Sequence, residues 1–279
     1  MITIKQIESP VVVTDGSTDV NLYAGQTYTC EVPVVNDWFE MEIDTLISAS
    51  SPSDSFILPF NAGDLTVDWE SNGVLDYITD ITGLTDSRLS HTYSTTGLKI
   101  IRIKGNGTIT SSAVDKNKIT SVKNCGSFVF TDVNFFGYSN LVWDATDPIT
   151  TIDYSFSNAF RSAPNLTNFP NLSKCLIASF RGVADGSQFD SNIGYLDLRS
   201  CTDMLNFARN VTTWSTANYN ASLMGFLRMQ AGDTAPPTGW VLKSNVPFHA
   251  GNAVATGDGL IARSILINTF NWTITDSTP

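Results

Sequence analysis

The chain has few of the residues on which acid–base and nucleophilic enzymes rely. It contains 2 histidines among 279 residues, His91 and His249. A serine hydrolase triad needs a histidine beside a serine on a strained turn, and the G-x-S-x-G form of that turn is missing. His91 lies near Tyr93 in a strand-like segment, where we expect a structural, hydrogen-bonded imidazole. The sequence therefore predicts no catalytic site, no cofactor and no enzymatic activity.

Clusters of basic residues are also missing. The chain carries 16 Lys and Arg against 27 Asp and Glu, for a formal net charge of −11 at pH 7. A protein that binds nucleic acid needs cations that displace the counterions of the phosphates. We therefore expect no nucleic-acid partner, and the acidity favours solubility instead.

Long apolar runs are absent as well. No run approaches the roughly 18 residues that span a bilayer, so the sequence predicts no membrane insertion. Residues 1–8, M-I-T-I-K-Q-I-E, lack the apolar core of a signal peptide. We expect a protein that is made in the host cytoplasm and does not use the general secretory route, unless a leader was trimmed.

Cysteine is scarce and its spacing excludes a zinc motif. The 4 cysteines are Cys30, Cys125, Cys175 and Cys201, and none forms a C-x-x-C pair. We expect buried free thiols, with a Cys175–Cys201 disulfide as the alternative.

What the chain does contain is typical of a folded β-protein. Apolar residues make up 42% of it and charged residues 15%, which is a globular balance. Leu65, Val67 and Trp69 alternate with polar residues, as in a half-buried strand. A second strand is predicted at 98–104, where the doubled Ile100-Ile101 indicates either a bulge or a strand covered on both faces.

These two strands carry a resemblance to a known family. The string Val67-Asp68-Trp69, a turn ending at Gly73, and His91-Thr92-Tyr93 followed by Gly97 resemble the PKD-like immunoglobulin-type domain. The usual V-D-W-G-D-G of that family is V-D-W-E-S-N-G here, so one glycine and one aspartate are lost. The resemblance implies a β-sandwich at residues 37–110 that serves as a spacer or adhesion module.

Residues 1–36 are predicted to form a separate β arm. Strand-like segments at 11–13 and 28–32 are bounded by the turn pairs Asp15-Gly16 and Ala24-Gly25. Such an arm either attaches the protein to a virion or a neighbouring subunit, or simply covers the next domain.

An irregular repeat occupies residues 111–232. Five segments each carry a phenylalanine expected in the core, with short strand-like pieces between them such as 119–122, 149–152 and 195–198. At 19 to 27 residues apart, each unit must stack on its neighbours to bury its apolar face. A nonrepetitive β-rich domain is the alternative. The five residues are Phe136, Phe160, Phe180, Phe207 and Phe226.

This phenylalanine pattern resembles the divergent leucine-rich repeats of the BspA-like and mycoplasma-lipoprotein type. Such repeats occur in surface proteins and in bacteriophage virion proteins. Residues 233–279, with a predicted helix at 257–267 and a strand at 271–276, resemble the C-terminal cap of those phage-associated proteins. A cap is required because the last repeat otherwise exposes its core.

Candidate binding residues are few. An acidic group could hold calcium, but the D-x-[DN]-x-[DN]-G loop is missing, and we expect Asp68 to accept backbone N–H groups in its turn. No pair of carboxylates stands out as glycosidase-like. Aromatic side chains of the repeat region, if exposed together, are the candidate receptor-facing residues. The acidic group is Asp64, Asp68, Glu70 and Asp76, and the aromatic residues are Trp143, Tyr154, Trp214 and Tyr219.

The sequence as a whole favours a mainly β chain with an immunoglobulin-like sandwich, a short leucine-rich-repeat-like solenoid and a C-terminal cap. The function expected is that of a non-catalytic bacteriophage structural protein on the virion exterior, either a tail or fibre adhesin or a head decoration protein. Its expected partners are other virion proteins, copies of itself as a homo-oligomer, with a trimer favoured, and a host surface glycan or protein. The alternatives are a bacterial cell-surface adhesin and a tailspike enzyme that degrades glycans.

Overall fold

The chain folds into two compact units, Met1–Asn36 and Asp37–Pro279. The computed structural model describes residues 2–4, 11–14, 19–22, 28–30, 36–151 and 155–279. The described elements make the fold mainly β, as the sequence predicts. Contacts do not divide residues 37–279 further, so the segments predicted at 37–110, 111–232 and 233–279 lie within one unit with one continuous core.

The first unit consists of short antiparallel strand pairs. β1 (Ile2–Ile4) pairs with β4 (Tyr28–Cys30), and β2 (Val11–Thr14) pairs with β3 (Asp19–Leu22). The strand predicted at 11–13 is thus present as β2, and residues 28–30 of the strand predicted at 28–32 form β4, whereas residues 31 and 32 lie outside the described residues. The turns predicted at 15–16 and 24–25 lie outside the described residues.

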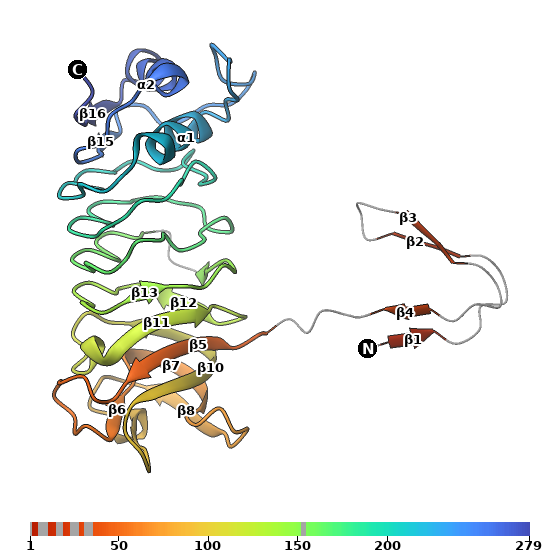
Figure 1. Cartoon of the computed structure of the whole chain (residues 1–279), viewed down its shortest axis with the longest axis vertical. Helices are drawn as coiled ribbons and strands as arrows, with labels where there is room; N and C mark the ends of the chain where they lie inside the picture. Colours follow the sequence, from red (N-terminus) through yellow and green to blue (C-terminus); the bar gives the residue numbers. More distant parts are fainter. Residues whose placement is uncertain (1, 5–10, 15–18, 23–27, 31–35, 152–154) are drawn as a thin grey trace. The chain divides into compact units, whose positions relative to one another are not determined.

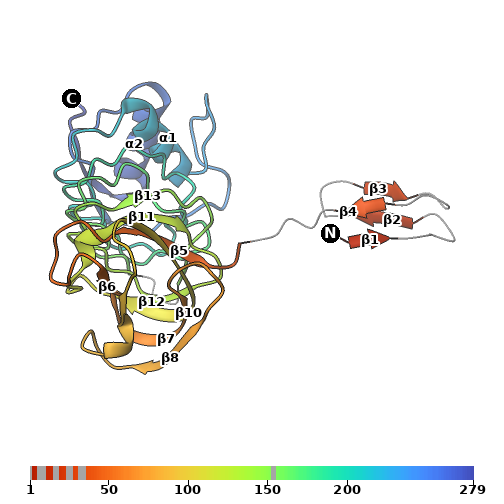
Figure 2. The same ribbon diagram turned by 60° about the horizontal axis from the view of Figure 1, so that its bottom comes forward.

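The second unit begins with an eight-stranded mixed sheet, which is consistent with the predicted sandwich (Figures 1 and 2). Its hydrogen-bonded order is β13-β11-β5-β10-β12-β14, and β7 pairs with both β10 and β8. The strands are β5 (Phe39–Asp44), β7 (Phe60–Asp68), β8 (Asp76–Ile81), β10 (Leu98–Ile109), β11 (Ile119–Asn124), β12 (Val129–Asp132), β13 (Val142–Trp143) and β14 (Thr150–Thr151).

Smaller elements accompany the eight-stranded sheet. β6 (Ser55–Ile57) pairs antiparallel with β9 (Ser90–Thr92), which directly follows the 3₁₀ turn η1 (Ser87–Leu89). A second 3₁₀ turn, η2 (Lys116–Lys118), leads into β11. The fully buried ammonium of Lys118 donates to the carbonyl oxygens of Ser51, Pro52 and Ser55 and to the Ser51 hydroxyl. This lysine therefore ties the 51–55 loop to the start of β11.

The central strand β10 has side chains that are at least partly buried on both of its faces. Ile101 and Ile103 are fully buried, whereas Ile100 is half-buried on the opposite face. Pairing with β5 keeps one register from Leu98 to Ile103. The doubled isoleucine is therefore not a bulge, and it marks a strand with some cover on both faces. β10 is long enough to pair with β5 near its start and with β12 near its end. It therefore connects the antiparallel part of the sheet to the parallel strands that begin the coils.

The turn after β7 forms as expected. The carboxylate of Asp68 accepts hydrogen bonds from the backbone N–H of Asn72 at 3.0 Å and of Gly73 at 2.9 Å. Ser71 and Gly73 have positive φ angles of 51° and 84°. The His91 ring stacks on Trp69 with centroids 5.0 Å apart and contacts Glu70 at 3.3 Å. These contacts join the segment after β7 to β9, and they give His91 a packed, hydrogen-bonded position.

Beyond β12 the chain forms a stack of coils held by parallel backbone hydrogen bonds (Figure 1). Phe156 donates to the carbonyl of Ser179 at 2.9 Å, and Phe180 donates to that of Asp203 at 2.7 Å. Isolated parallel bridges join Ser155 to Ser179 and Ser179 to Asp203, a step of 24 residues each time. Isolated backbone bridges, and not extended strands, therefore hold most neighbouring coils together.

The coils turn at equivalent corners. Asn158, Gly182 and Asn206 follow one another at intervals of 24 residues, and their φ angles are 59°, 62° and 58°. This left-handed conformation favours glycine and asparagine. A Cβ atom at Gly182 would lie 2.7 Å from the Asn158 Oδ1 atom, so the two neighbouring corners are also in close contact.

Aromatic rings fill the interior of the stack. Four of the five phenylalanines predicted in the core are fully buried there: Phe160, Phe180, Phe207 and Phe226. The prediction for Phe136 is wrong, because its side chain is 38% exposed and its neighbour Phe135 is buried instead. The Phe135 ring stacks on that of Phe160 with centroids 5.6 Å apart and planes 9° apart.

The last coils end on two helices and a small sheet. α1 (Thr216–Phe226) begins at the N-cap Ser215 and was not predicted, because its apolar residues read as part of the repeat. α2 (Gly257–Phe270) confirms the helix expected at 257–267. β16 (Thr273–Thr275) lies within the strand expected at 271–276 and pairs in parallel with β15 (Pro247–His249). Met204 of the last coil bridges to Phe248 of β15, so this end continues the parallel stacking.

A buried ionic contact closes the C-terminal end. The Asp276 carboxylate accepts from Arg263 Nε at 2.9 Å and from the Tyr219 hydroxyl at 2.6 Å. Burial raises the pKa of Asp276, but these hydrogen bonds outweigh it and hold the pKa below its ordinary value of 3.8. Asp276 thus joins α1, α2 and the end of the chain.

We expect Phe207→Ala to lower the free energy of unfolding by about 3–5 kcal/mol, because it removes a ring that contacts several others and leaves a cavity. Urea unfolding followed by circular dichroism measures the change. The control Leu46→Ala, at a side chain 63% exposed, should stay within about 0.5 kcal/mol of wild type. Equal effects of the two substitutions would contradict the aromatic interior.

We expect Asp276→Asn to destabilise the protein by about 2 kcal/mol at neutral pH, since the charge-assisted hydrogen bonds are weakened. The pKa of Asp276 is lower in the folded state than in the unfolded state. Its contribution to stability is therefore present above about pH 4 and is lost as the pH falls through the folded-state pKa. Urea midpoints of the two proteins should converge in acid, and a gap that stays constant from about pH 7 to about pH 3 would count against this role.

Candidate functional site

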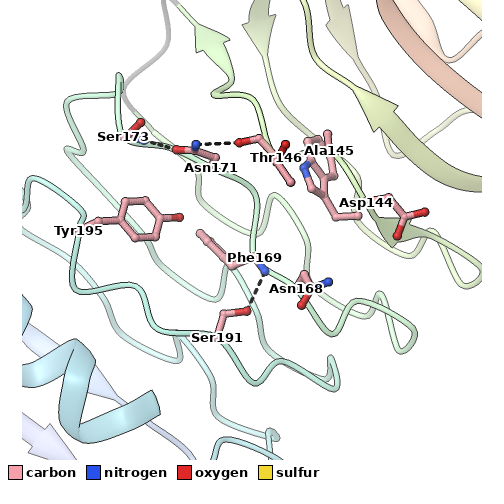
Figure 3. A pocket seen from close by; sticks show the side chains of 10 residues that line it. Asp144, Ala145, Thr146, Asn168, Phe169, Asn171, Ser173, Ser191 and Tyr195 are labelled. Atoms are coloured by element: carbon pink, nitrogen blue, oxygen red, sulfur yellow. Dashed lines mark hydrogen bonds between the residues drawn. The ribbon is translucent and has the colours of Figure 1, made fainter. Parts of the chain in front are cut away.

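A groove crosses three successive coils of the stack (Figure 3). Its volume is about 510 Å³. The lining comes from the segment after β13, from residues 168–173 one coil further, and from residues 191 and 195 in the next coil. The lining residues are Trp143, Asp144, Ala145, Thr146, Asn168, Phe169, Asn171, Ser173, Ser191 and Tyr195.

Hydrogen bonds between coils hold the groove walls in place. Asn171 Nδ2 donates to the Thr146 carbonyl at 2.9 Å, while its Oδ1 accepts from the Ser173 N–H at 3.1 Å. Ser191 Oγ accepts from the Phe169 N–H at 3.1 Å. Asn171 and Ser191 thus tie their coils to a neighbouring coil, so this part of the wall is in place before any ligand arrives.

Tyr195 forms the aromatic wall of the groove. Its side chain is 37% exposed, and its hydroxyl donates to the Pro170 carbonyl at 2.8 Å. Burial raises the pKa of Tyr195 to about 12, so the phenol stays protonated near neutral pH. The ring therefore offers a partly open aromatic surface, and its hydroxyl is already used as a donor.

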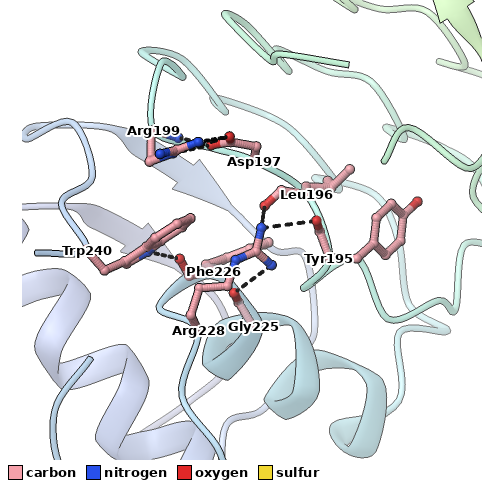
Figure 4. Close-up of polar contacts among 8 residues, drawn as sticks. All are labelled: Tyr195, Leu196, Asp197, Arg199, Gly225, Phe226, Arg228 and Trp240. Carbon is pink, nitrogen blue, oxygen red and sulfur yellow. Dashed lines mark hydrogen bonds and ion pairs between the residues drawn. The ribbon is translucent and has the colours of Figure 1, made fainter. Parts of the chain in front are cut away.

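Arg228 fixes the turn that carries Tyr195 (Figure 4). Its guanidinium donates to the carbonyl oxygens of Gly194 at 2.8 Å, Tyr195 at 3.2 Å and Leu196 at 3.3 Å. The backbone of Arg228 is itself left-handed, with φ of 56°. One cation after α1 thus satisfies three successive carbonyls and sets the position of the tyrosine.

Trp240 lies between this arginine and a second one. The Arg228 and Arg199 guanidinium carbons are 4.9 and 5.0 Å from the centroid of its ring, and its Nε1 donates to the Phe226 carbonyl at 2.8 Å. Cation–π contacts of this kind stabilise by about 0.5–1 kcal/mol each at exposed sites. They dock the 230–246 loop against the turn beside the groove.

The groove has a single carboxylate. Asp144 accepts from Lys123 Nζ and from Ser121 Oγ, both at 2.8 Å, and the Lys123 hydrogen bond lowers the pKa of Asp144. It is ionised and already paired near neutral pH. Glycoside hydrolysis by the usual route needs a second carboxylate at about 5–10 Å, and the other lining residues are neutral. The arrangement suits binding through hydrogen bonds and ring contacts.

The aromatic residues proposed to face a receptor are differently placed. Trp143 is 1% exposed, Trp214 5% and Tyr219 0%, so for these three the prediction of an exposed binding face is wrong. Their rings pack against the aromatic interior, where burial of large apolar area is most favourable. Trp143 reaches only the floor of the groove. Tyr154 lies outside the described residues.

The sequence did contain a signal for the groove that was missed. In the stretch 164–172, P-N-L-T-N-F-P-N-L, an asparagine recurs every third residue. Asn165 and Asn171 donate to carbonyls of the preceding coil, and Asn168 lines the groove. Asparagine in a repeat protein is therefore informative when read as a link between coils.

The acidic group near β7 is used within the protein. Asp64 accepts from the Asp80 N–H at 2.8 Å, Asp68 caps its turn, and Glu70 contacts His91. In the part of the chain that the structure describes, no group of three or more His, Cys, Asp or Glu is arranged to hold a metal ion.

The cysteines with described side chains are free and buried. Burial raises the pKa of Cys175 to about 11 and that of Cys201 to about 12, and it raises the pKa of Cys125 as well. Buried free thiols are thus confirmed for these three, and the alternative Cys175–Cys201 disulfide is not formed. The side chain of Cys30 lies outside the described residues.

Comparison with known proteins gives no relatives. No protein-family model, no curated protein and no solved structure matches this chain. Within the described residues, neither helix combines the length and the apolar character needed to cross a membrane.

Proposed function

We propose that the chain is a non-catalytic structural protein displayed on the exterior of a bacteriophage virion, and that the groove binds a host surface glycan. The observation that carries the binding role is the composition of the groove. It combines an aromatic wall at Tyr195 with neutral amide and hydroxyl groups that are held by the coils. This combination suits a sugar, because one face of the sugar ring is apolar and packs on an aromatic side chain, while the hydroxyl groups at its edge form hydrogen bonds.

The module types support display and adhesion. The sheet end carries the V-D-W and H-T-Y strings of the PKD-like resemblance, and the 24-residue step between several coils is in keeping with the proposed leucine-rich-repeat-like solenoid. α1, α2 and the β15–β16 pair cover the last coil in the manner of a solenoid cap. Repeats of this geometry present broad surfaces that suit recognition of other molecules.

The first 36 residues are the proposed attachment arm. The strands described there have only 3 or 4 residues each, and isolated two-stranded pairs of this length are marginally stable in water. An arm of this size gains stability by adding its strands to a partner. We assign that role to another virion protein or to copies of this chain, with a trimer favoured.

A bacterial cell-surface adhesin is the second candidate, and it shares the same groove. The two differ in where the protein is found, not in how it binds. A tailspike glycan-degrading enzyme is the third, and the single paired carboxylate of the groove weighs against it.

We expect antibody against this chain to label intact phage particles in negative-stain electron microscopy. Label on the capsid shell indicates decoration, and label on the tail indicates an adhesin. Label found only in a bacterial membrane fraction would overturn the virion role in favour of the cell-surface adhesin, while leaving the groove's ligand open to test.

We expect the full chain to bind members of an array of neutral bacterial surface oligosaccharides, and Tyr195→Ala to weaken the strongest interaction about tenfold through loss of ring contact. Calorimetric titration with that oligosaccharide measures the change. Tyr77→Ala is the matched control, since Tyr77 is 71% exposed on β8 and away from the groove.

Thermal melting should first show that both tyrosine variants remain folded. No interaction on the array, or equal affinity of the Tyr195 and Tyr77 variants, would disprove glycan binding in the groove. Steady release of shorter oligosaccharides during the titration would instead support the enzyme.

A further inference from the structure

A second, smaller hollow lies on other segments of the coils. Its volume is about 220 Å³, enough for about one sugar ring. It is formed where the coil after β12 meets the next coil, and it shares no residue with the groove. The lining residues are Ser111, Asn134, Phe136, Ser157, Asn158 and Arg161.

The register of the coils places Arg161 beside this hollow and in a column of equivalent positions. Gly137 donates to the Arg161 carbonyl and Ser162 donates to the Asp185 carbonyl, so Phe136, Arg161 and Asp185 follow one another up the stack. Arg209 comes next, 24 residues after Asp185, and pairs with it. The column therefore contains, in order, one aromatic side chain, one cation, one anion and a second cation.

This column contains more positive than negative charge. Asp185, whose side chain is 3% exposed, receives Arg209 at 2.9 Å and the Asn210 amide at 2.6 Å. Arg161 reaches the same carboxylate at the longer distance of 3.3 Å and remains 40% exposed. Two guanidinium groups share one carboxylate, so Arg161 keeps unneutralised charge at the edge of the hollow.

A second cation borders the same hollow. Lys116 Nζ donates to the carbonyl oxygens of Ser111 at 2.9 Å and of Phe136 at 3.4 Å, and both residues line it. The Phe136 ring is 38% exposed, and the Arg161 guanidinium carbon lies 5.7 Å from its centroid. The partly exposed ring of Phe136 thus has the Arg161 guanidinium over its face, and the Phe136 carbonyl accepts from the Lys116 ammonium. The hollow is thus bordered by two cations in a chain whose net charge is −11.

We propose that this hollow binds a sugar that carries a carboxylate, such as a hexuronate. The carboxylate contacts Arg161, whose planar fork matches it, with Lys116 adding charge from the side. The sugar ring lies against Phe136, and its hydroxyl groups meet the side chains of Asn134, Ser157 and Asn158. A bare inorganic anion leaves the ring and the amide groups unused, so a sugar acid fits better than phosphate. The site is separate from the groove proposed to bind neutral glycans and does not depend on it.

The test uses the full chain and three probes: glucuronate, glucose and inorganic phosphate. Ligand-observed nuclear magnetic resonance titration should show saturable binding of glucuronate, at least about tenfold weaker binding of glucose, and a decline in glucuronate binding as sodium chloride is raised. Phosphate bound as tightly as glucuronate would overturn the proposal, because it would show an anion site without sugar recognition. No saturable binding of glucuronate would overturn it too.

Two arginine variants locate the site. Arg161→Gln should weaken glucuronate about ten- to a hundredfold, the usual worth of a hydrogen bond to a charged group. Arg181→Gln is the matched control, since Arg181 is 52% exposed and pairs with Asp203 in the next coil, outside the hollow. Phe136→Ala should weaken glucuronate but leave phosphate unchanged.

Thermal melting should show that all three variants are folded, which is expected because the substituted side chains are partly exposed. Equal effects of the Arg161 and Arg181 substitutions would place the binding elsewhere and disprove the assignment. If the Tyr195 substitution in the groove leaves glucuronate binding unchanged, the two sites are independent, as proposed.

Discussion

Each coil of this protein depends on its neighbours for both its hydrogen bonds and its core. The backbone N–H groups of Phe156 and Phe180 find their acceptors one coil further along, and the ring of Phe169 contacts Phe160, Phe180, Phe189 and Phe207. A coil alone has neither a closed hydrogen-bond ladder nor a buried interior. The sheet around β10 at one end and the two helices at the other are needed because a stack built this way has two open ends.

The same stacking of coils creates the groove and the hollow. Side chains at equivalent positions of successive coils come together in columns, so residues that are far apart in sequence form one wall. Phe136, Arg161 and Asp185 form such a column, and the groove is likewise lined by residues of three successive coils, among them Thr146, Asn171 and Tyr195. The hollow results from the stacking of the coils alone, whereas the groove also depends on Arg228, which positions the turn of Tyr195.

The predictions from sequence succeeded where structure is local. The strands around Val67 and Ile101, the Asp68 turn and the helix that begins at Gly257 are each specified by neighbouring residues. Phe136 failed because it follows Phe135 directly, and a 24-residue spacing with small variations cannot decide which of two adjacent rings points inward. α1 was missed because Tyr219, Leu223 and Phe226 are apolar in either a repeat or a helix. The groove was missed because its residues are asparagines and serines, which individually read as turns.

The recurring left-handed corners at Asn158, Gly182 and Asn206 have a consequence for how such a protein can change in length. Each corner packs against the equivalent corner of the preceding coil, as Gly182 does against Asn158. Inserting or deleting a whole coil therefore keeps the columns of equivalent side chains aligned. Adding a single residue shifts the rest of that coil by one position, which takes its corner out of line with the neighbouring corners and disturbs the packing of the aromatic interior. The molecule can therefore be lengthened or shortened by evolution in complete coils, and the surfaces on its flanks widen or narrow by the same unit.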